Sequence, residues 1–254
     1  MAAAGTAPGV QSVLHITDLH LLDSEEKRLL DTDTTGTLRS VLAAATRERQ
    51  PTALLATGDI AHDPVVATYR RCLDILGEFH GGPLLCLPGN HDLLQPMVDA
   101  GMPMEPVRLG PWRILPWDTH EDDGPGAVWR RADWEELLEA IETSGDHLVV
   151  ATHHPLVDVG CPWLDKDRLR NAPELVECLA QATSVKSVVF GHAHQTVESR
   201  HGHMALLGTP STCFQFEPHS LEFGLDGSAP GYRWLHLHDD GSLRTEVRRI
   251  KEIH

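Results

Sequence analysis

The sequence predicts an α/β fold in which parallel strands alternate with helices and an antiparallel segment follows near the C-terminus. Short apolar runs alternate with amphipathic stretches from Ser12 to Phe190, a pattern typical of layered α/β architecture. The sequence Asp-Asp-Gly-Ser at 239–242 separates two further runs and predicts a hairpin turn. These observations predict a mixed sheet or two stacked sheets. The absence of a repeat or linker predicts one domain over residues 1–254.

The first part of the chain predicts three strands joined by two helices. A helix is expected over Leu38–Arg49, because apolar residues recur there at helical spacing and Pro51 follows. The same spacing predicts a second helix over Val65–Phe79. Helical connections of this kind predict parallel strand pairing. The strands are expected in the short apolar runs Ser12–Thr17, Ala53–Thr57 and Leu84–Leu87.

The remainder of the chain predicts further strands and two more helices. Five prolines between Pro96 and Pro116 predict that this stretch is mostly loop. Asp133 and Glu136 form a capping-box pattern, which predicts a helix from there to about Ile141. Another helix is expected at Pro173–Ala182. The expected strands are His147–Thr152, Val185–Phe190, Met204–Leu207, Tyr232–His238 and Leu243–Ile250.

The composition excludes several classes of protein. Lys and Arg number 21 against 37 Asp and Glu, and the net charge of −16 argues against binding to nucleic acid or anionic membranes. No apolar run approaches the ~18 residues of a membrane-spanning helix, and the first ten residues show no secretory signal. The five cysteines are widely spaced, which favours reduced thiols over disulfides. We therefore expect a cytoplasmic protein, as a monomer or a homodimer.

Five of the predicted strands end directly before side chains that bind metals in proteins. Ligands of α/β proteins collect outside the carboxyl ends of the strands, so these side chains are expected to converge at one edge. Gly58, Gly89 and Gly191 each precede one of them, where a missing Cβ lets the backbone turn sharply. In strand order the candidate ligands are Asp18 and His20, Asp59, Asn90, His153, and finally His192 and His194.

The donor types in this set favour a dinuclear catalytic centre. Mixed oxygen and nitrogen donors suit Mn, Fe or Zn better than Ca or Mg, and the lack of Cys argues against a structural zinc site. Seven ligands are too many for one catalytic ion with an open position, but they suit two ions ~3.5–4 Å apart that share a carboxylate. The sequence therefore predicts two divalent or trivalent ions per chain, with Fe or Mn favoured and Zn as a further option.

Taken in order, the motifs D-x-H, G-D, G-N-H-D, H-H-P and G-H-x-H resemble those of the calcineurin-like metallophosphoesterase superfamily, from Val13 to Pro210. The resemblance implies a four-layer α/β/β/α sandwich of two mixed sheets, with the dinuclear site at the sheet edges. His153 is preferred to His154 as a ligand, because the family pattern is His-x-Pro. The resemblance assigns Asp18, His20 and His194 to one metal, Asn90, His153 and His192 to the other, and Asp59 to both.

Looser blocks at 161–165, 169–171, 208–212 and 230–233 are similar to the bacterial class III 3′,5′-cyclic-AMP phosphodiesterases. This resemblance implies that a small-molecule phosphodiester, cyclic AMP, is hydrolysed to 5′-AMP by in-line attack of a metal-bridging hydroxide. His91 is expected to protonate the leaving oxygen or neutralise the transition state, and Asp92 to orient its ring. Asp59 and Asn90 complete the expected catalytic set. The expected substrate contacts are His20, Asp59, Asn90, His91 and His194.

Several alternatives are compatible with the same residues. The metal core would be unchanged in a phosphodiesterase for glycerophosphodiesters or other small diesters. A catalytically silent scaffold with this fold is an alternative of another class, although it has no need for seven ligands. A metal-storage or metal-sensor function is a weaker hypothesis still, because ligands spread over five strand ends build an open catalytic site and not a closed one. Trp163 and Phe214 are explained equally well by a base pocket and by ordinary packing.

Overall fold

Two mixed β-sheets form the centre of the protein in a computed structural model, which describes residues 9–122, 124 and 126–250. The first sheet has the strand order β13-β12-β1-β2-β3, in which β1, β2 and β3 are parallel and β12 and β13 are antiparallel neighbours. Its strands are β1 (Val10–Ile16), β2 (Ala53–Thr57), β3 (Leu84–Leu87), β12 (Gly231–His238) and β13 (Leu243–Arg249).

The second large sheet has the order β4-β5-β6-β7-β9-β8, with β5, β6, β7 and β9 parallel and an antiparallel strand at each edge. Its strands are β4 (Val107–Leu109), β5 (Trp112–Pro116), β6 (His147–Ala151), β7 (Val185–Phe190), β8 (Val197–His201) and β9 (Met204–Gly208). A separate short pair consists of β10 (Gln215–Phe216) and β11 (Leu225–Asp226).

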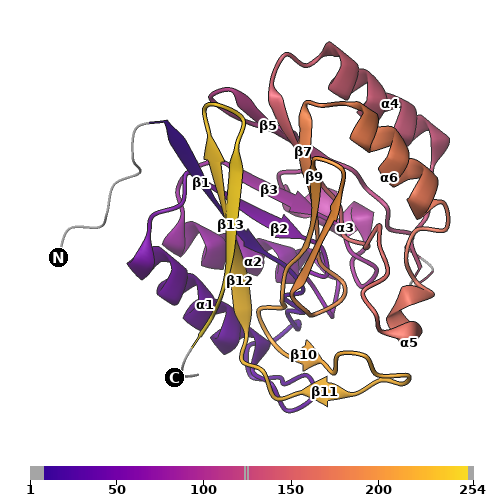
Figure 1. The fold of residues 1–254 in the computed structure, drawn as a ribbon. Coiled ribbons are helices and arrows are strands. Elements are labelled where there is room, and N and C mark those ends of the chain that lie inside the picture. Colours follow the sequence, from indigo (N-terminus) through magenta and orange to yellow (C-terminus); the bar gives the residue numbers. More distant parts are fainter. Residues whose placement is uncertain (1–8, 123, 125, 251–254) are drawn as a thin grey trace.

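Helices cover the outer faces of both large sheets, which gives the expected four-layer α/β/β/α sandwich (Figure 1). One side carries α1 and α2, and the other carries α4 and α6. The helices are α1 (Thr34–Glu48), α2 (Val66–Phe79), α3 (Leu94–Ala100), α4 (Arg131–Thr143), α5 (Pro162–Asp165) and α6 (Ala172–Gln181).

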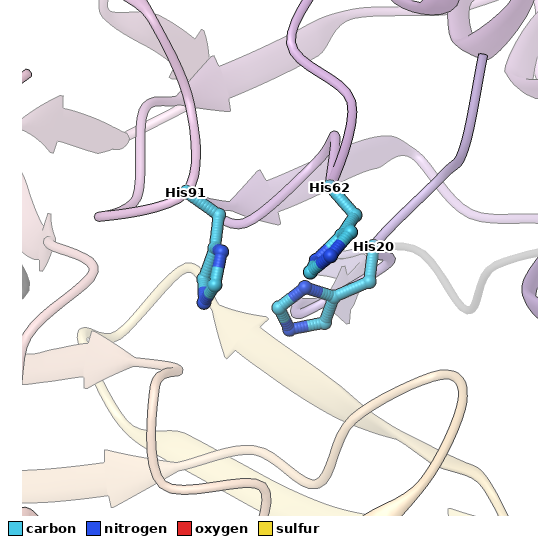
Figure 2. A group of neighbouring side chains, drawn as sticks. All are labelled: His20, His62 and His91. Carbon is cyan, nitrogen blue, oxygen red and sulfur yellow. The ribbon is translucent and has the colours of Figure 1, made fainter. Parts of the chain in front are cut away.

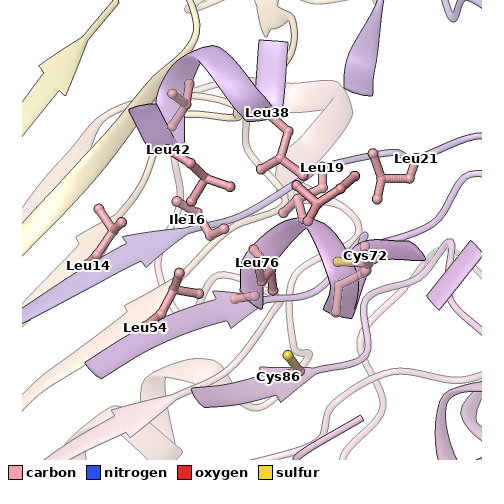
Figure 3. Close-up of a cluster of buried hydrophobic side chains, with 14 of the residues drawn as sticks. Leu14, Ile16, Leu19, Leu21, Leu38, Leu42, Leu54, Cys72, Leu76 and Cys86 are labelled. Atoms are coloured by element: carbon pink, nitrogen blue, oxygen red, sulfur yellow. The ribbon is translucent and has the colours of Figure 1, made fainter. Parts of the chain in front are cut away.

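Three apolar layers hold this sandwich together. Figure 3 shows the layer beneath α1 and α2, where Leu38 and Leu42 of α1 lie over Leu14 and Ile16 of β1. A second layer fills the space under α4 and α6, and a third lies between the two sheets. The parallel strands β2 and β6 are buried on both faces, which explains their almost continuous apolar sequences.

Two of the sequence-based expectations are wrong. The proline-rich stretch is not mostly loop, because α3, β4 and β5 lie within or across it. The capping box is also absent: α4 begins at Arg131, and the carboxylate of Asp133 pairs with Arg130 Nε at 2.6 Å. Asp33, in contrast, caps α1 by accepting the Gly36 N–H, so this helix begins before the apolar spacing does.

Two of the expectations from the sequence concern a membrane-spanning helix and a secretory signal. Within the part of the chain that the structure describes, no helix combines the length and the apolar composition needed to cross a membrane. The expectation about a secretory signal rests mainly on residues 1–8, which lie outside the described residues.

Candidate metal centre

The seven candidate ligands lie on turns that follow the carboxyl ends of five parallel strands, as the sequence predicts. Three of these strands, β1, β2 and β3, belong to the first sheet, and β6 and β7 belong to the second. Stacking of the two sheets brings the turns together. Six of the seven side chains are buried, and Asn90 is half-buried.

One group of side chains surrounds the turns after β1 and β7. Here His20 Nε2 lies 3.1 Å from His194 Nε2 and 3.6 Å from Asp59 Oδ2. Asp18 Oδ1 is 3.5 Å from the same nitrogen of His194. These four residues place one donor atom each within 4.8 Å of one another, close enough to share an ion.

A second group surrounds Asn90. Its Oδ1 lies 2.9 Å from His192 Nδ1 and 3.1 Å from His153 Nε2. Asp59 Oδ1 is 3.5 Å from His153 Nε2, so the two oxygens of this one carboxylate face the two groups. The neighbouring His154 is buried beside the second group, with Nδ1 3.0 Å from Thr119 Oγ1.

In two of the imidazoles, the hydrogen bond made by Nδ1 shows that the lone pair of Nε2 points into the candidate metal centre. His153 Nδ1 donates to the Thr57 carbonyl at 2.7 Å, and His194 Nδ1 donates to the Phe214 carbonyl at 2.8 Å. In a neutral imidazole the other nitrogen then carries a lone pair. The Nε2 lone pair of His153 therefore faces the Asn90 oxygen, an arrangement that a cation between them would stabilise. The residues thus fit a dinuclear metal site.

Electrostatics support the same conclusion. Burial lowers the pKa of His192 to about 3 and that of His194 to about 4, so both rings are neutral donors at pH 7. Burial, reinforced by the charge of Asp59, raises the pKa of Asp18. For Asp59, burial acts to raise the pKa, but the neighbouring imidazoles of His153 and His20 hold it below its usual range. Two buried carboxylates within 4.8 Å of each other need positive charge beside them, which two metal ions would supply.

Backbone strain is concentrated at this centre. Within the described chain, eight residues other than glycine have positive φ, and five of them are candidate ligands. Such conformations persist only where the surrounding structure enforces them, and they are enriched at functional sites. The five ligands and their φ values are Asp18 (52°), His20 (47°), Asp59 (48°), His192 (64°) and His194 (48°).

Two glycines let the ligand turns approach closely. A Cβ at Gly89 would lie 2.3 Å from Asp59 N and Oδ1, and one at Gly191 would lie 1.9 Å from Thr17 Oγ1. Neither glycine has a positive φ, so close packing rather than a sharp turn explains them. Gly58, with φ of 88°, fits the expected sharp turn.

Asp92 does not orient His91, contrary to the sequence-based expectation. Its carboxylate accepts the backbone N–H groups of Ile60, Ala61 and Gly89 at 2.8–3.0 Å and the hydroxyl of Tyr69 at 3.0 Å. Asp92 therefore joins the turn after β2 to the turn after β3. Through these bonds it positions the two turns that carry Asp59 and Asn90.

His91 is held instead by two other histidines. Its backbone N–H donates to Asp59 Oδ1 at 2.9 Å, and its exposed ring is 4.9 Å from the ring of His20 and 5.3 Å from that of His62, centroid to centroid. Figure 2 shows the three rings directed into one space. His62 is not among the site residues predicted from the sequence, although it lies only three residues after Asp59.

A cavity of about 350 Å³ opens beside these histidines. His20, Asp59, Asn90 and His91 line it, with His192 and His194, so the expected substrate contacts all reach one cavity. Its other lining residues are mostly apolar, with Trp163 and Phe214 among them, and they also include His62 and Asp167.

Comparisons with known proteins agree with this geometry. The family model of calcineurin-like phosphoesterases matches residues 12–196. A 3′,5′-cyclic adenosine monophosphate phosphodiesterase, CpdA, from Pseudomonas aeruginosa is 37% identical over 95% of this chain and 90% of its own. The protein of the same name from Escherichia coli is 38% identical over 94% of this chain and 90% of its own.

Solved structures with a similar fold include phosphatases. A purple acid phosphatase from yellow lupin has a TM-score of 0.66 at 15% identity, covering 99% of this chain and 54% of that one. A dimetal phosphatase from Danio rerio has a TM-score of 0.63 at 13% identity, covering 94% and 98%. At these identities the likeness establishes the fold alone.

Proposed function

Because this chain belongs to the calcineurin-like phosphoesterase family, we propose that it is a metal-dependent phosphodiesterase that hydrolyses 3′,5′-cyclic AMP to 5′-AMP. One observation carries the chemical part of the proposal: the two oxygens of Asp59 face two separate groups of inward-pointing donors. The names of the relatives support the substrate.

We assign one metal ion to each of the two groups of side chains described above. Asp18, His20 and His194 hold one ion, and Asn90, His153 and His192 hold the other, with Asp59 bridging. The mixture of oxygen and nitrogen donors without Cys favours Fe or Mn, with Zn as the alternative. Two such ions lower the pKa of bound water towards ~7 and leave a small net positive charge for a phosphodiester anion.

The positive charge matters because the cavity has no cation of its own. Among the described residues, no Lys or Arg lines it, and the whole chain carries −16. A phosphate group therefore binds at the end of the cavity where His20, Asp59 and His194 lie. The Asn90 amide is half-buried in the second group, and we expect its N–H donors to stabilise charge on an equatorial phosphate oxygen.

The exposure of the His91 ring supports its proposed role as the proton donor. Its ring is exposed to the cavity, whereas the rings of the proposed ligands are buried. In-line addition of water to phosphorus breaks the P–O3′ bond, and His91 supplies the proton that converts the leaving O3′ into a hydroxyl. The water loses its own proton to the medium and His91 regains one from the medium, so the cyclic phosphodiester is opened to 5′-AMP with no further reactant.

The remaining parts of the proposal concern context. The acidic charge favours a free nucleotide over nucleic acid as the substrate. A cytoplasmic location, one domain over residues 1–254, and a monomeric or homodimeric state stay predictions.

The test is turnover of cyclic AMP by the Mn-reconstituted protein, with 5′-AMP followed by chromatography and Asp59→Asn as the control. We expect kcat/KM of ~10⁴ M⁻¹s⁻¹ or above, with loss of turnover and of bound metal in the variant. If only a generic aryl phosphodiester is cleaved, the metal chemistry stands and the substrate is wrong. No turnover of either diester would favour the scaffold, and two ions retained by Asp59→Asn would refute the bridging role.

A further inference from the structure

The cavity beside the metal centre has two chemically different ends. One end is formed by the histidines and carboxylates described above. The other is formed by two short segments, α5 and the β10–β11 hairpin, which lie at the same end of the molecule (Figure 1). The apolar side chains at this end are Leu29, Leu30, Trp163, Leu164, Phe214, Phe216 and Phe223.

Three of these rings form a cluster. Trp163 lies 5.0 Å from Phe216 and 5.7 Å from Phe223, and the two phenylalanines are 5.6 Å apart, with all three pairs edge to face. Phe216 also stacks on the candidate ligand His194 with 4.1 Å between centroids. The aromatic surface is therefore continuous with the metal centre.

Part of this surface is uncovered. Phe223 is 56% exposed and Leu30 is 46% exposed, although both line the cavity. Exposed apolar side chains gathered at the mouth of a concave site are typical of a ligand-binding surface. A flat apolar ligand would remove both from water.

The charge of the residues that line this end of the cavity restricts which ligands it can bind. Asp167 also lines the cavity, its carboxylate has no hydrogen bond or ion pair within the described chain, and burial raises its pKa. With an acid at this end and no Lys or Arg among the described lining residues, a second phosphate would be repelled. The end suits a flat, uncharged group with N–H donors, and a nucleobase has all three properties.

We propose that the surface formed by Trp163, Phe216 and Phe223 stacks on the nucleobase of the substrate, so that the β10–β11 hairpin makes the enzyme select cyclic nucleotides over small diesters without a base. This inference rests on the proposed function for the identity of the phosphate group. Stacking contributes equally before and during the chemical step, because the reacting phosphorus lies at the opposite end of the cavity. It therefore lowers KM and leaves kcat unchanged.

The test uses Phe223→Ala in the metal-loaded protein. Leu221→Ala is the matched control, since Leu221 is 77% exposed on the same hairpin but does not line the cavity. Because Phe223 is exposed and does not contact a candidate ligand, its loss is not expected to disturb the metal centre. For Phe223→Ala we expect KM for cyclic AMP to rise about tenfold, since stacking on one aromatic side chain changes affinity by roughly that factor or more. We expect unchanged kcat and metal content, and wild-type values for Leu221→Ala.

Binding of adenosine, which has a base but no phosphate, separates this inference from the proposed function. Calorimetry should detect adenosine binding to the wild type and about tenfold weaker binding to Phe223→Ala. If adenosine binds in this way but cyclic AMP is not turned over, the base site stands and the proposed function fails. If cyclic AMP is turned over, while Phe223→Ala keeps KM within twofold of wild type and adenosine does not bind, the base site is refuted. Trp163→Phe, which keeps a ring, should retain most of the affinity.

Discussion

Gly191→Ala is the substitution that tests most directly whether close packing of the ligand turns holds the metal centre. A Cβ at this position lies 1.9 Å from Thr17 Oγ1 and 2.8 Å from Asp18 Oδ2, whereas ordinary contact begins at 3.4 Å. The new methyl group therefore needs Thr17 Oγ1 to move by about 1.5 Å and the candidate ligand atom Asp18 Oδ2 by about 0.6 Å. Alanine tolerates the backbone conformation, since φ is not positive there, so the effect is purely steric.

The expected magnitude follows from this displacement. Asp18 accepts the His192 N–H at 3.1 Å, and both residues are candidate ligands, so separating the turns moves donors of both groups. A misplacement of ~1 Å in a catalytic site can cost ~10²-fold in rate. Overpacking of a buried site costs roughly 1–3 kcal/mol of folding free energy. We expect kcat/KM to fall at least ~100-fold, with fewer than two ions bound.

The assay combines metal content by mass spectrometry, steady-state turnover of cyclic AMP, and urea unfolding. Gly77→Ala is the control, because a Cβ there has no atom within 4 Å and lies in α2. This control should keep full activity and gain ~0.5–1 kcal/mol, the usual advantage of alanine over glycine in a helix. Two bound ions and kcat/KM within threefold of wild type for Gly191→Ala would refute the reasoning.

Two further predictions use buried or stacked histidines. His15 lies between the hydroxyls of Thr57 and Thr209 at 2.7 Å each, and burial, with the charge of Arg233, lowers its pKa to about 3. Between pH 6.5 and pH 3, His15 is protonated in the unfolded chain but not in the folded protein. Its contribution to stability is therefore complete above pH 6.5 and is lost as the pH falls towards 3. His15→Gln should flatten the decline in unfolding free energy by up to ~1.4 kcal/mol per pH unit in that window, and equal slopes in both proteins would contradict this. His62→Ala removes the ring stacked beside His91, so kcat for cyclic AMP should fall several-fold while two ions stay bound; an unchanged kcat would exclude a positioning role for His62.

Much of the fold could be predicted because it depends on local patterns. Strand β2 and strand β3 agree with their expected ranges, since a strand buried on both faces is a short continuous apolar run. The antiparallel hairpin of β12 and β13 follows from its turn residues, with Gly241 at φ of 81°.

The proline-rich stretch shows where local patterns fail. Pro96 lies in the first turn of α3, where a missing N–H costs nothing, and Pro116 ends β5. Strand β5 is short, and it is held by pairing with β6, where Trp112 lies opposite His147. Pairing over such a sequence separation leaves no local signal.

The sequence by itself determined which donors this protein has and in which order they leave the strands. The residue types of the donors and the glycines beside them can be read directly from the sequence without a structure. The tertiary structure decided that the two oxygens of Asp59 face different groups, that Asp92 binds backbone N–H groups rather than His91, and that an aromatic hairpin lines one end of the cavity. The Asp92 contacts depend on the distance between two neighbouring turns of the first sheet. The position of the Asp59 carboxylate depends on distances between turns that belong to different sheets. Only the packing of one sheet on the other sets those distances.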